Sequence, residues 1–277
     1  MSNQISRRQF LGLAGSTAAI FGLGLTGCGS SSSSSTSGST AGSASSASGS
    51  VKGQKFIIGM DTVYAPFEYT DDSGDFVGID VDILNAVAAD QGFEVEINSL
   101  GFDAALAALE SGQVDGVIAG MSITDERKKK YDFSDGYYET YVSIAAKEGS
   151  DYKSLDDLKG ATVAAKTATI GASCAEDLKD EYDLTITYFD TSDLMFQDTL
   201  TCNSAACFED YPVMAYGITQ GNGFEIIDTV KGDYSAEYGF AVLKGENADL
   251  LAAFDKGLAN IKESGEYDEI CAKYLGE

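Results

Sequence analysis

Short apolar runs alternate with longer stretches of helical periodicity from residue 55 to the end of the chain. The first run, Lys55–Met60, precedes Asp80–Ala89, where apolar residues recur at the three- and four-residue spacing of a helix face. The other predicted strands are Glu94–Ile97, Gly116–Gly120, Thr162–Ala165, Leu184–Tyr188 and Ala206–Glu209. The other predicted helices are Phe102–Leu109, a segment from about Ile170, Asp193–Leu200, Leu250–Glu263 and Tyr267–Tyr274. This alternation predicts an α/β fold with parallel sheets.

The strands and helices form two successive series, which predicts two α/β lobes rather than one. Two extended stretches, Thr140–Lys147 and Glu237–Lys244, lie at the junctions of the series and are candidate hinge strands. Ligands of open α/β sheets bind beyond the carboxyl ends of the strands. Two facing lobes therefore predict a ligand cleft between them.

The first fifty residues have a different composition and read as an export signal followed by a tether. Ser6–Leu11 carries a twin-arginine pattern, and Leu11–Leu25 is too short and too weakly apolar to span a membrane stably. Leu25–Cys28 resembles a lipobox, so residues 1–27 are the expected signal peptide and Cys28 the expected lipidation site. Residues 28–51, rich in Ser and Gly, are expected to tether the protein to the outer face of the bacterial cytoplasmic membrane. General secretory export is the alternative route.

Composition excludes several classes of function. The chain of 277 residues has no His, so Ser-His-Asp catalysis and His-ligated metal sites are excluded. The net charge of -26 argues against a nucleic-acid partner, because phosphates are bound by Lys and Arg. We expect no metal and no cofactor, and a monomer.

Three charged residues have a pattern suited to a zwitterion. Arg127 is the sole arginine beyond the export signal, and its planar guanidinium suits bidentate binding of a carboxylate. Asp61 and Asp210 each follow a predicted strand, where a carboxylate could bind an ammonium group. The alternatives are a surface position for Arg127 and a turn or helix cap for each aspartate.

Further candidates surround these charges. Lys166–Gly171 leads from a strand into a helix, where free N–H groups and the Thr169 hydroxyl could bind a carboxylate oxygen. Tyr64 and Phe102 could enclose an aliphatic chain. Helix capping is the alternative for Thr169, and core packing for the two aromatic residues.

Several segments resemble the polar amino-acid receptors of ABC importers. These segments are Gly59–Tyr69, Phe76–Ile83, Ala119–Lys129, Asp132–Tyr138, Leu155–Gly160 and Gly265–Ile270. The resemblance covers about Lys52 to Gly276 and implies an α/β, two-lobed periplasmic-binding-protein-like fold with two crossover hinge strands. Lobe 1 would comprise residues 52–141 and 239–277, and lobe 2 residues 142–238.

The resemblance also implies a role for each candidate residue. Arg127 would bind the α-carboxylate with help from Gly120 and Ser122, and Asp210 would bind the α-ammonium group. The remaining contacts would come from the helix start at Thr169 and Ile170 and from the rings of Tyr64 and Phe102. The bound amino acid would be delivered to an ABC permease and its ATPase.

Glutamine is the expected ligand, because glutamine-binding members pair an Asp like Asp61 with a Lys like Lys166 around the side-chain amide. Ala168 and Ile170 depart from the family pattern, and Ile170 could narrow the pocket. Glu209 also departs from the glutamine-binding members and adds negative charge near the ammonium group. An amide satisfies Asp61 and Lys166 together because it both donates and accepts hydrogen bonds.

Two other functions are compatible with the same pattern. One is a cyclohexadienyl-dehydratase-like lyase, in which Glu68 or Glu209 would act as the general acid. The other is a sensory lipoprotein without a transport partner. Four cysteines remain beyond the signal, and we expect any disulfide among them to lie within lobe 2, with free buried thiols as the alternative. They are Cys174, Cys202, Cys207 and Cys271.

Overall fold

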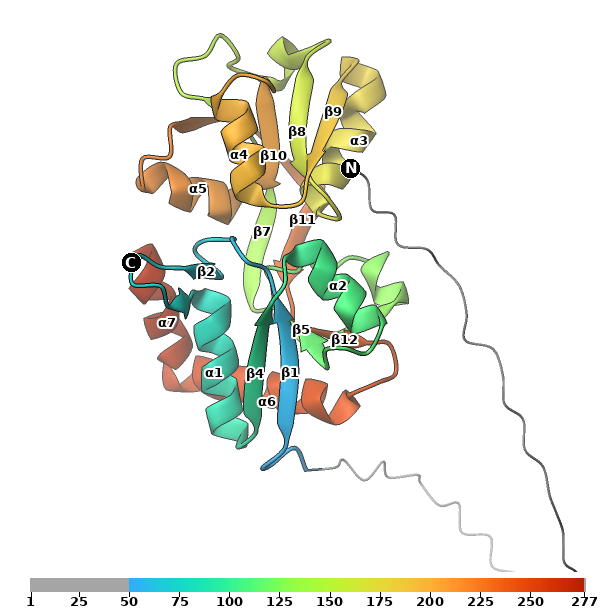
Figure 1. Ribbon diagram of the computed structural model, residues 1–277, viewed down its shortest axis with the longest axis vertical. Coiled ribbons are helices and arrows are strands. Elements are labelled where there is room, and N and C mark those ends of the chain that lie inside the picture. Colours follow the sequence, from blue (N-terminus) through green and yellow to red (C-terminus); the bar gives the residue numbers. More distant parts are fainter. Residues whose placement is uncertain (1–49, 277) are drawn as a thin grey trace, which may run out of the picture. The chain divides into compact units, whose positions relative to one another are not determined.

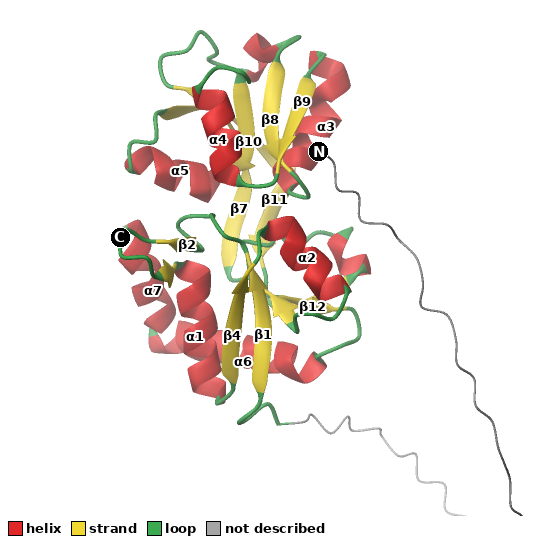
Figure 2. Cartoon of the chain, viewed as in Figure 1, coloured by secondary structure: helices red, strands yellow, loops and turns green. Residues whose placement is uncertain are grey.

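The computed structural model describes residues 50–276 and shows two α/β lobes joined by two long strands, β7 (Tyr138–Lys147) and β11 (Phe224–Tyr238) (Figure 1). Helices flank the sheet of each lobe (Figure 2). The predicted two-lobed α/β architecture is therefore confirmed.

Lobe 1 contains a five-stranded sheet in the order β4-β1-β5-β12-β6 and a small hairpin. Its strands are β1 (Lys55–Met60), β2 (Tyr69–Thr70), β3 (Phe76–Val77), β4 (Glu94–Ser99), β5 (Gly116–Val117), β6 (Tyr131–Phe133) and β12 (Ala241–Leu243). Its helices are α1 (Ile79–Gln91), α2 (Phe102–Glu110), the 3₁₀ turn η1 (Arg127–Lys129), α6 (Ala248–Ser264) and α7 (Glu266–Leu275).

Lobe 2 contains the sheet β11-β7-β10-β8-β9, in which the joining strand β11 forms one edge and β7 lies next to it. Its other strands are β8 (Thr162–Lys166), β9 (Thr185–Phe189) and β10 (Ala206–Asp210). Its helices are the 3₁₀ turn η2 (Leu155–Leu158), α3 (Ile170–Tyr182), α4 (Ser192–Leu200) and α5 (Tyr211–Thr219).

Each sheet separates two apolar clusters, as the alternation of side chains along a strand requires. In β1, Ile58 and Met60 pack with α1 and α6 residues, whereas Ile57 packs against the cluster around Phe102. In β10, Phe208 and Cys207 likewise belong to different clusters. The strands that carry the candidate site are thus fixed on both faces.

The prediction of parallel sheets is correct for four strand pairs, β1 with β4 and β5, and β8 with β9 and β10, but the sheets are mixed. β7 pairs antiparallel with both β10 and β11, and β12 pairs antiparallel with β5 and β6. The antiparallel pairs arise where the chain crosses between the lobes and returns, because a strand that comes back runs opposite to the one that left.

The second predicted hinge strand, Glu237–Lys244, is wrong as a single element. β11 ends at Tyr238 and β12 begins at Ala241. Between them the N–H of Gly239 donates to the Met121 carbonyl, and a side chain at this glycine would collide with Ile123. The crossing strand is therefore β11, whose residues Ser235–Tyr238 pair with Tyr138–Tyr141 of β7.

Two smaller expectations differ from the structure. Val51, placed in the predicted tether, is 7% exposed and packs in the lobe 1 core, so the folded region begins before Lys52. No disulfide forms among the four cysteines of the described chain: Cys174 and Cys207 are buried, Cys271 is half-buried, Cys202 is exposed, and all four are free.

Candidate functional site

Nine of the ten predicted ligand-binding residues line one cavity between the lobes. The nine are Tyr64, Phe102, Gly120, Ser122, Arg127, Lys166, Thr169, Ile170 and Asp210, and Ala119 completes the lining. The tenth, Asp61, lies behind the cavity in contact with Lys166. The cavity measures about 10 Å³, roughly the space that one water molecule needs. An amino acid can occupy it only when the lobes or their side chains move apart.

Arg127 lines the cavity and makes its hydrogen bonds there. Its guanidinium lies 5.3 Å from the centre of the Phe102 ring, and Nη1 donates to the Ser122 carbonyl at 2.7 Å. Nη2 donates across the lobes to the Ala168 carbonyl at 2.9 Å. Because both acceptors are neutral carbonyls, an incoming carboxylate would offer this guanidinium a stronger, charge-assisted partner.

Asp210 lies opposite, at the end of β10, and is 4% exposed. It occupies the N-cap position of α5 without capping it, because its Oδ2 accepts hydrogen bonds from the hydroxyls of Tyr64 at 2.7 Å and Tyr238 at 2.6 Å. Burial raises the pKa of Asp210, and the two tyrosine hydroxyls and Arg127 oppose the rise. The result is a buried carboxylate held in place to face a cation.

Asp61 and Lys166 form a buried ion pair between the lobes. Both side chains are almost fully buried, at 1% and 2% exposed, and the ammonium group of Lys166 donates to Oδ2 of Asp61. The same ammonium lies 4.5 Å from the centre of the Tyr64 ring. A buried pair of this kind needs both partners, because either charge alone would be costly in a dry site.

The cavity wall at Gly120 is supported from behind by a second buried carboxyl group. The N–H of Gly120 donates to Oδ2 of Asp80 at 2.7 Å, and the Tyr137 hydroxyl donates to the same oxygen at 2.8 Å. Burial raises the pKa of Asp80 to about 6, and burial raises that of its neighbour Glu68 well above the usual range. Gly120 has a φ of 52°, and a Cβ there would lie 2.4 Å from the Tyr64 ring, so no larger residue fits.

Thr169 and Ile170 form the lobe 2 wall at the start of α3. Thr169 is the N-cap residue, and its hydroxyl oxygen accepts from the N–H of Ala172 at 3.2 Å and donates to the Lys166 carbonyl at 2.7 Å. The alternative of helix capping is therefore correct for Thr169, which also lines the cavity. Ile170 is 8% exposed and contributes an apolar surface.

Three residues beside the predicted set take part in this network. Tyr238 shares Asp210 with Tyr64, and the two phenol oxygens lie 3.2 Å apart. Ser192 is the first residue of α4, and its hydroxyl donates to Oε2 of Glu209 at 2.8 Å. Sequence gave no signal for Tyr238 or Ser192, because their roles depend on how β11 and α4 pack. The sequence pattern predicts Glu209 as an added negative charge or as the general acid of a lyase, but not as the partner of Ser192.

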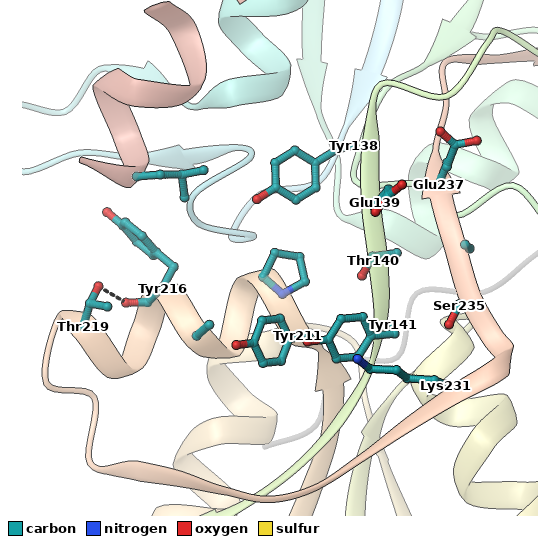
Figure 3. Close-up of a pocket in the computed structure, with 14 residues that line it drawn as sticks. Tyr138, Glu139, Thr140, Tyr141, Tyr211, Tyr216, Thr219, Lys231, Ser235 and Glu237 are labelled. Atoms are coloured by element: carbon teal, nitrogen blue, oxygen red, sulfur yellow. Dashed lines mark hydrogen bonds between the residues drawn. The ribbon is translucent and has the colours of Figure 1, made fainter. Parts of the chain in front are cut away.

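A much larger hollow, about 970 Å³, lies along the joining strands and α5 rather than at these charges (Figure 3). Tyr141 and Tyr211 stack there with their ring centres 4.6 Å apart, and the ammonium group of Lys231 lies 4.4 Å from the Tyr141 ring centre. Tyr138 and Tyr216 also line it. We call this hollow the hinge groove. It contains none of the ten predicted site residues.

The acids that a lyase would need do not line the inter-lobe cavity. Glu68 is fully buried beside Asp80, and Glu209 is 2% exposed behind Asp210. Over residues 50–276, no three His, Cys, Asp or Glu side chains gather in a way that could hold a metal ion.

Comparison with known families decides the class of protein to which this architecture belongs. Residues 56–277 match the bacterial extracellular solute-binding proteins, family 3. The chain belongs to this family. The match covers both lobes and both joining strands.

Relatives of this solute-binding protein bind amino acids. The chain is 34% identical over 264 residues to the arginine-binding extracellular protein ArtP of Bacillus subtilis, covering 93% of this chain and 95% of the relative. It is 34% identical to the arginine-, lysine-, histidine-binding protein ArtJ of Geobacillus stearothermophilus, with a TM-score of 0.73 over 81% of this chain and 96% of that one. An ancestral arginine-binding protein bound to glutamine is 36% identical, with a TM-score of 0.73 over 80% and 98% of the two chains.

The predicted signal peptide, twin-arginine pattern and lipidation site at Cys28 lie outside the described residues. Across residues 50–276, no helix is both long and apolar enough to cross a membrane.

Proposed function

We propose that this solute-binding protein captures an L-amino acid with a polar side chain between its lobes and delivers it to an ABC permease in the membrane. The observation that carries the proposal is the clustering of Arg127, Asp210, Asp61 and Lys166 around one inter-lobe cavity. The first two match the carboxylate and ammonium groups common to all amino acids, and the other two face the side chain.

Three contacts between the lobes would be exchanged when the ligand binds. Arg127 would release the Ala168 carbonyl, Tyr64 would share Asp210 with the ammonium group, and Lys166 would share Asp61 with the side chain. Each of these contacts joins a residue of lobe 1 to a residue of lobe 2. A ligand that takes their place would therefore contact charged groups of both lobes. Lobe closure around the ligand would then present both lobes to the permease.

Glutamine stays the first expected ligand, and arginine is the second. An amide could donate to Asp61 and accept from Lys166 without leaving either charge unpaired. The arginine-binding relatives favour a cationic side chain, which would have to displace Lys166 from Asp61. We propose no enzymatic activity, because Glu68 and Glu209 lie behind the cavity wall and reach no group placed inside it.

Calorimetric titration with each of the twenty common amino acids tests the proposal. We expect saturable binding of one or a few polar amino acids, lost in Arg127→Ala and kept in Lys128→Ala, an exposed neighbour on the same turn. The proposal fails if no amino acid binds, or if prephenate or arogenate is converted to product.

The lipid anchor is a separate proposal. We expect Cys28→Ala to release the full-length protein from membranes with its ligand affinity unchanged, because two acyl chains would supply the attachment. Cys202→Ala, at an exposed free thiol, is the matched control and should stay attached. Membrane retention of Cys28→Ala equal to that of the control would contradict the anchor.

A further inference from the structure

The buried charges around the cavity do not balance. Five carboxyl groups around the cavity are at most 4% exposed: Asp61, Glu68, Asp80, Glu209 and Asp210. Glu68 and Asp80 form a neighbouring pair behind Gly120, where burial raises the pKa of both. The other three lie near the two cations of the site. The facing cations are Lys166 and Arg127. An amino acid adds one carboxylate and one ammonium group and leaves this difference unchanged, so its side chain decides whether the site is neutral.

Among Asp61, Glu209 and Asp210, Glu209 is the carboxyl group that neither contacts a cation directly nor faces the position proposed for the ligand ammonium group. Lys166 contacts Asp61 directly, and Asp210 faces the position proposed for the ligand ammonium group. Glu209 instead accepts from the Ser192 hydroxyl at 2.8 Å and from the N–H of Asp210 at 2.9 Å, and the Tyr64 hydroxyl lies 3.5 Å away. Burial makes a carboxyl group hold a proton more readily than an exposed one, and the two donated hydrogen bonds oppose this effect without cancelling it.

We propose that Glu209 lets this site accept both neutral and cationic side chains, by exchanging its proton for the positive charge of the ligand. This inference rests on the proposed function. With a neutral side chain, Asp61 keeps Lys166 and Glu209 is protonated. With a cationic side chain, the ligand takes Asp61, Lys166 turns to Glu209, and the Glu209 proton passes to solvent.

The geometry provides the path for this exchange. The ammonium group of Lys166 touches Asp61 on one side and lies 3.5 Å from the Ser192 hydroxyl on the other, and that hydroxyl is bonded to Glu209. Lys166 thus stands between two carboxyl groups that it can serve in turn. An anionic side chain would leave two carboxylates unbalanced and is disfavoured.

The charged and titratable groups around Glu209 place its proton in the physiological range. Burial raises the pKa of Glu209 to about 7, Lys166 lowers it and Asp210 raises it. Burial holds the pKa of Tyr64 and Tyr238 well above their usual range, so both remain neutral donors. The titratable and charged groups that interact with Glu209 are Tyr64, Lys166, Cys207 and Asp210. Asp61 and Tyr238 lie one contact further away, bonded to Lys166 and Asp210.

The sign of the pH effect follows from linkage. Arginine binds the form with Glu209 ionised, so its affinity rises with pH up to the pKa of about 7 and up to one proton is released. Glutamine binds the protonated form, so its affinity falls as the pH rises above this pKa. Because both ligands share the α-carboxylate and α-ammonium groups, titration of those groups cancels in the arginine-to-glutamine affinity ratio.

Titration calorimetry with L-arginine and L-glutamine at pH 6 and pH 8, in buffers of different ionisation enthalpy, tests the inference. We expect the affinity ratio to rise by up to about a hundredfold from pH 6 to pH 8, the limit for one proton exchanged over two pH units. At pH 7 arginine should release protons and glutamine should take them up. In Glu209→Gln the ratio should stay at its acid value at both pH values. Glu209→Asp should restore the pH dependence, and the exposed control Glu148→Gln should behave like the wild type.

An affinity ratio that is the same at pH 6 and pH 8 in the wild type overturns the inference while the proposed function stands. A ratio that changes equally in the wild type and in Glu209→Gln also overturns it, because the proton then belongs to another group. If arginine, glutamine and all other amino acids fail to bind the wild type, the proposed function itself is wrong. Thermal melts identify any variant that has not folded.

Discussion

The inter-lobe cavity is small and lined by buried charged groups, whereas the hinge groove is large and its charged groups are exposed. The cavity holds about 10 Å³ but brings together four charged side chains, three of them almost fully buried. The hinge groove holds about 970 Å³, yet Lys231 and Glu139 in its lining are exposed to solvent. Its tyrosines stack on one another and on Lys231.

This comparison teaches that volume alone does not identify a binding site. Burying a charge is costly unless an opposite charge or a hydrogen bond compensates for the lost hydration. A cluster of buried charges in a cleft is therefore a candidate site for a charged ligand. The charged groups of the hinge groove stay hydrated, so they do not need a partner to compensate for lost water. The size of the groove instead reflects the space beside two strands that join the lobes.

Removal of the Arg127 guanidinium is expected to reduce affinity more than any other change. If it does not, the contrast between the inter-lobe cavity and the hinge groove loses its functional meaning. Arg127→Ala should weaken binding of every amino acid by about 2–5 kcal/mol or more, because the ligand carboxylate loses a desolvated, charge-assisted partner. Arg127→Lys should recover only part of this, since an ammonium group lacks the planar fork. Calorimetric affinity equal to the wild type in Arg127→Ala would remove the cavity as the binding site.

Changes to the Asp61–Lys166 pair sharpen the comparison by separating side-chain recognition from recognition of the common groups. Asp61→Asn and Lys166→Met should each weaken glutamine more than alanine, by about 1–3 kcal/mol, because each leaves one buried partner unsatisfied. Competition titration of both ligands against both variants measures the difference.

The two variants also distinguish glutamine from arginine. Tighter binding of arginine than of glutamine to the wild type, unchanged in Lys166→Met, would mean that Lys166 does not oppose a cationic side chain. The glutamine preference would then be wrong, while capture of an amino acid would stand.

A change in the hinge groove should have the smallest effect. Tyr141→Leu removes a stacked pair with Tyr211, which contributes about 0.5–1.5 kcal/mol. It should shift the affinities for all amino acids by one common factor, because the joining strands influence lobe closure rather than the ligand side chain. A changed glutamine-to-alanine ratio in this variant would show that the groove contributes to specificity.

Local pattern predicted most of the elements that carry the site. The strand at Lys55–Met60 and the helix at Phe102 begin where their apolar periodicity begins, since burial of one face dictates both. The helix α5 was missed, although Pro212 near its start is a usual signal for the first turn. Its apolar residues lie all around the helix, so no amphipathic period marks it.

The candidate residues were found by their chemistry, but their partners were not. The lone Arg127 and the strand-end positions of Asp61 and Asp210 are visible in the chain itself. The tyrosines that hold Asp210 lie 146 and 28 residues away along the chain, and the Lys166 partner of Asp61 lies 105 residues away. Contacts at such separations depend on how the lobes face each other.

The sequence by itself determined the class of this protein: local apolar periodicity fixes strands and helices, and the family segments carry the two-lobed fold. Only the tertiary structure decided that Tyr238 and Ser192 join the charged network and that Glu209 contacts no cation directly. The physical reason is that whether a charged group has a partner depends on which side chains the folded structure places beside it. Its hydration, its pKa and its response to a ligand depend on neighbours that the chain brings together by crossing twice between the lobes.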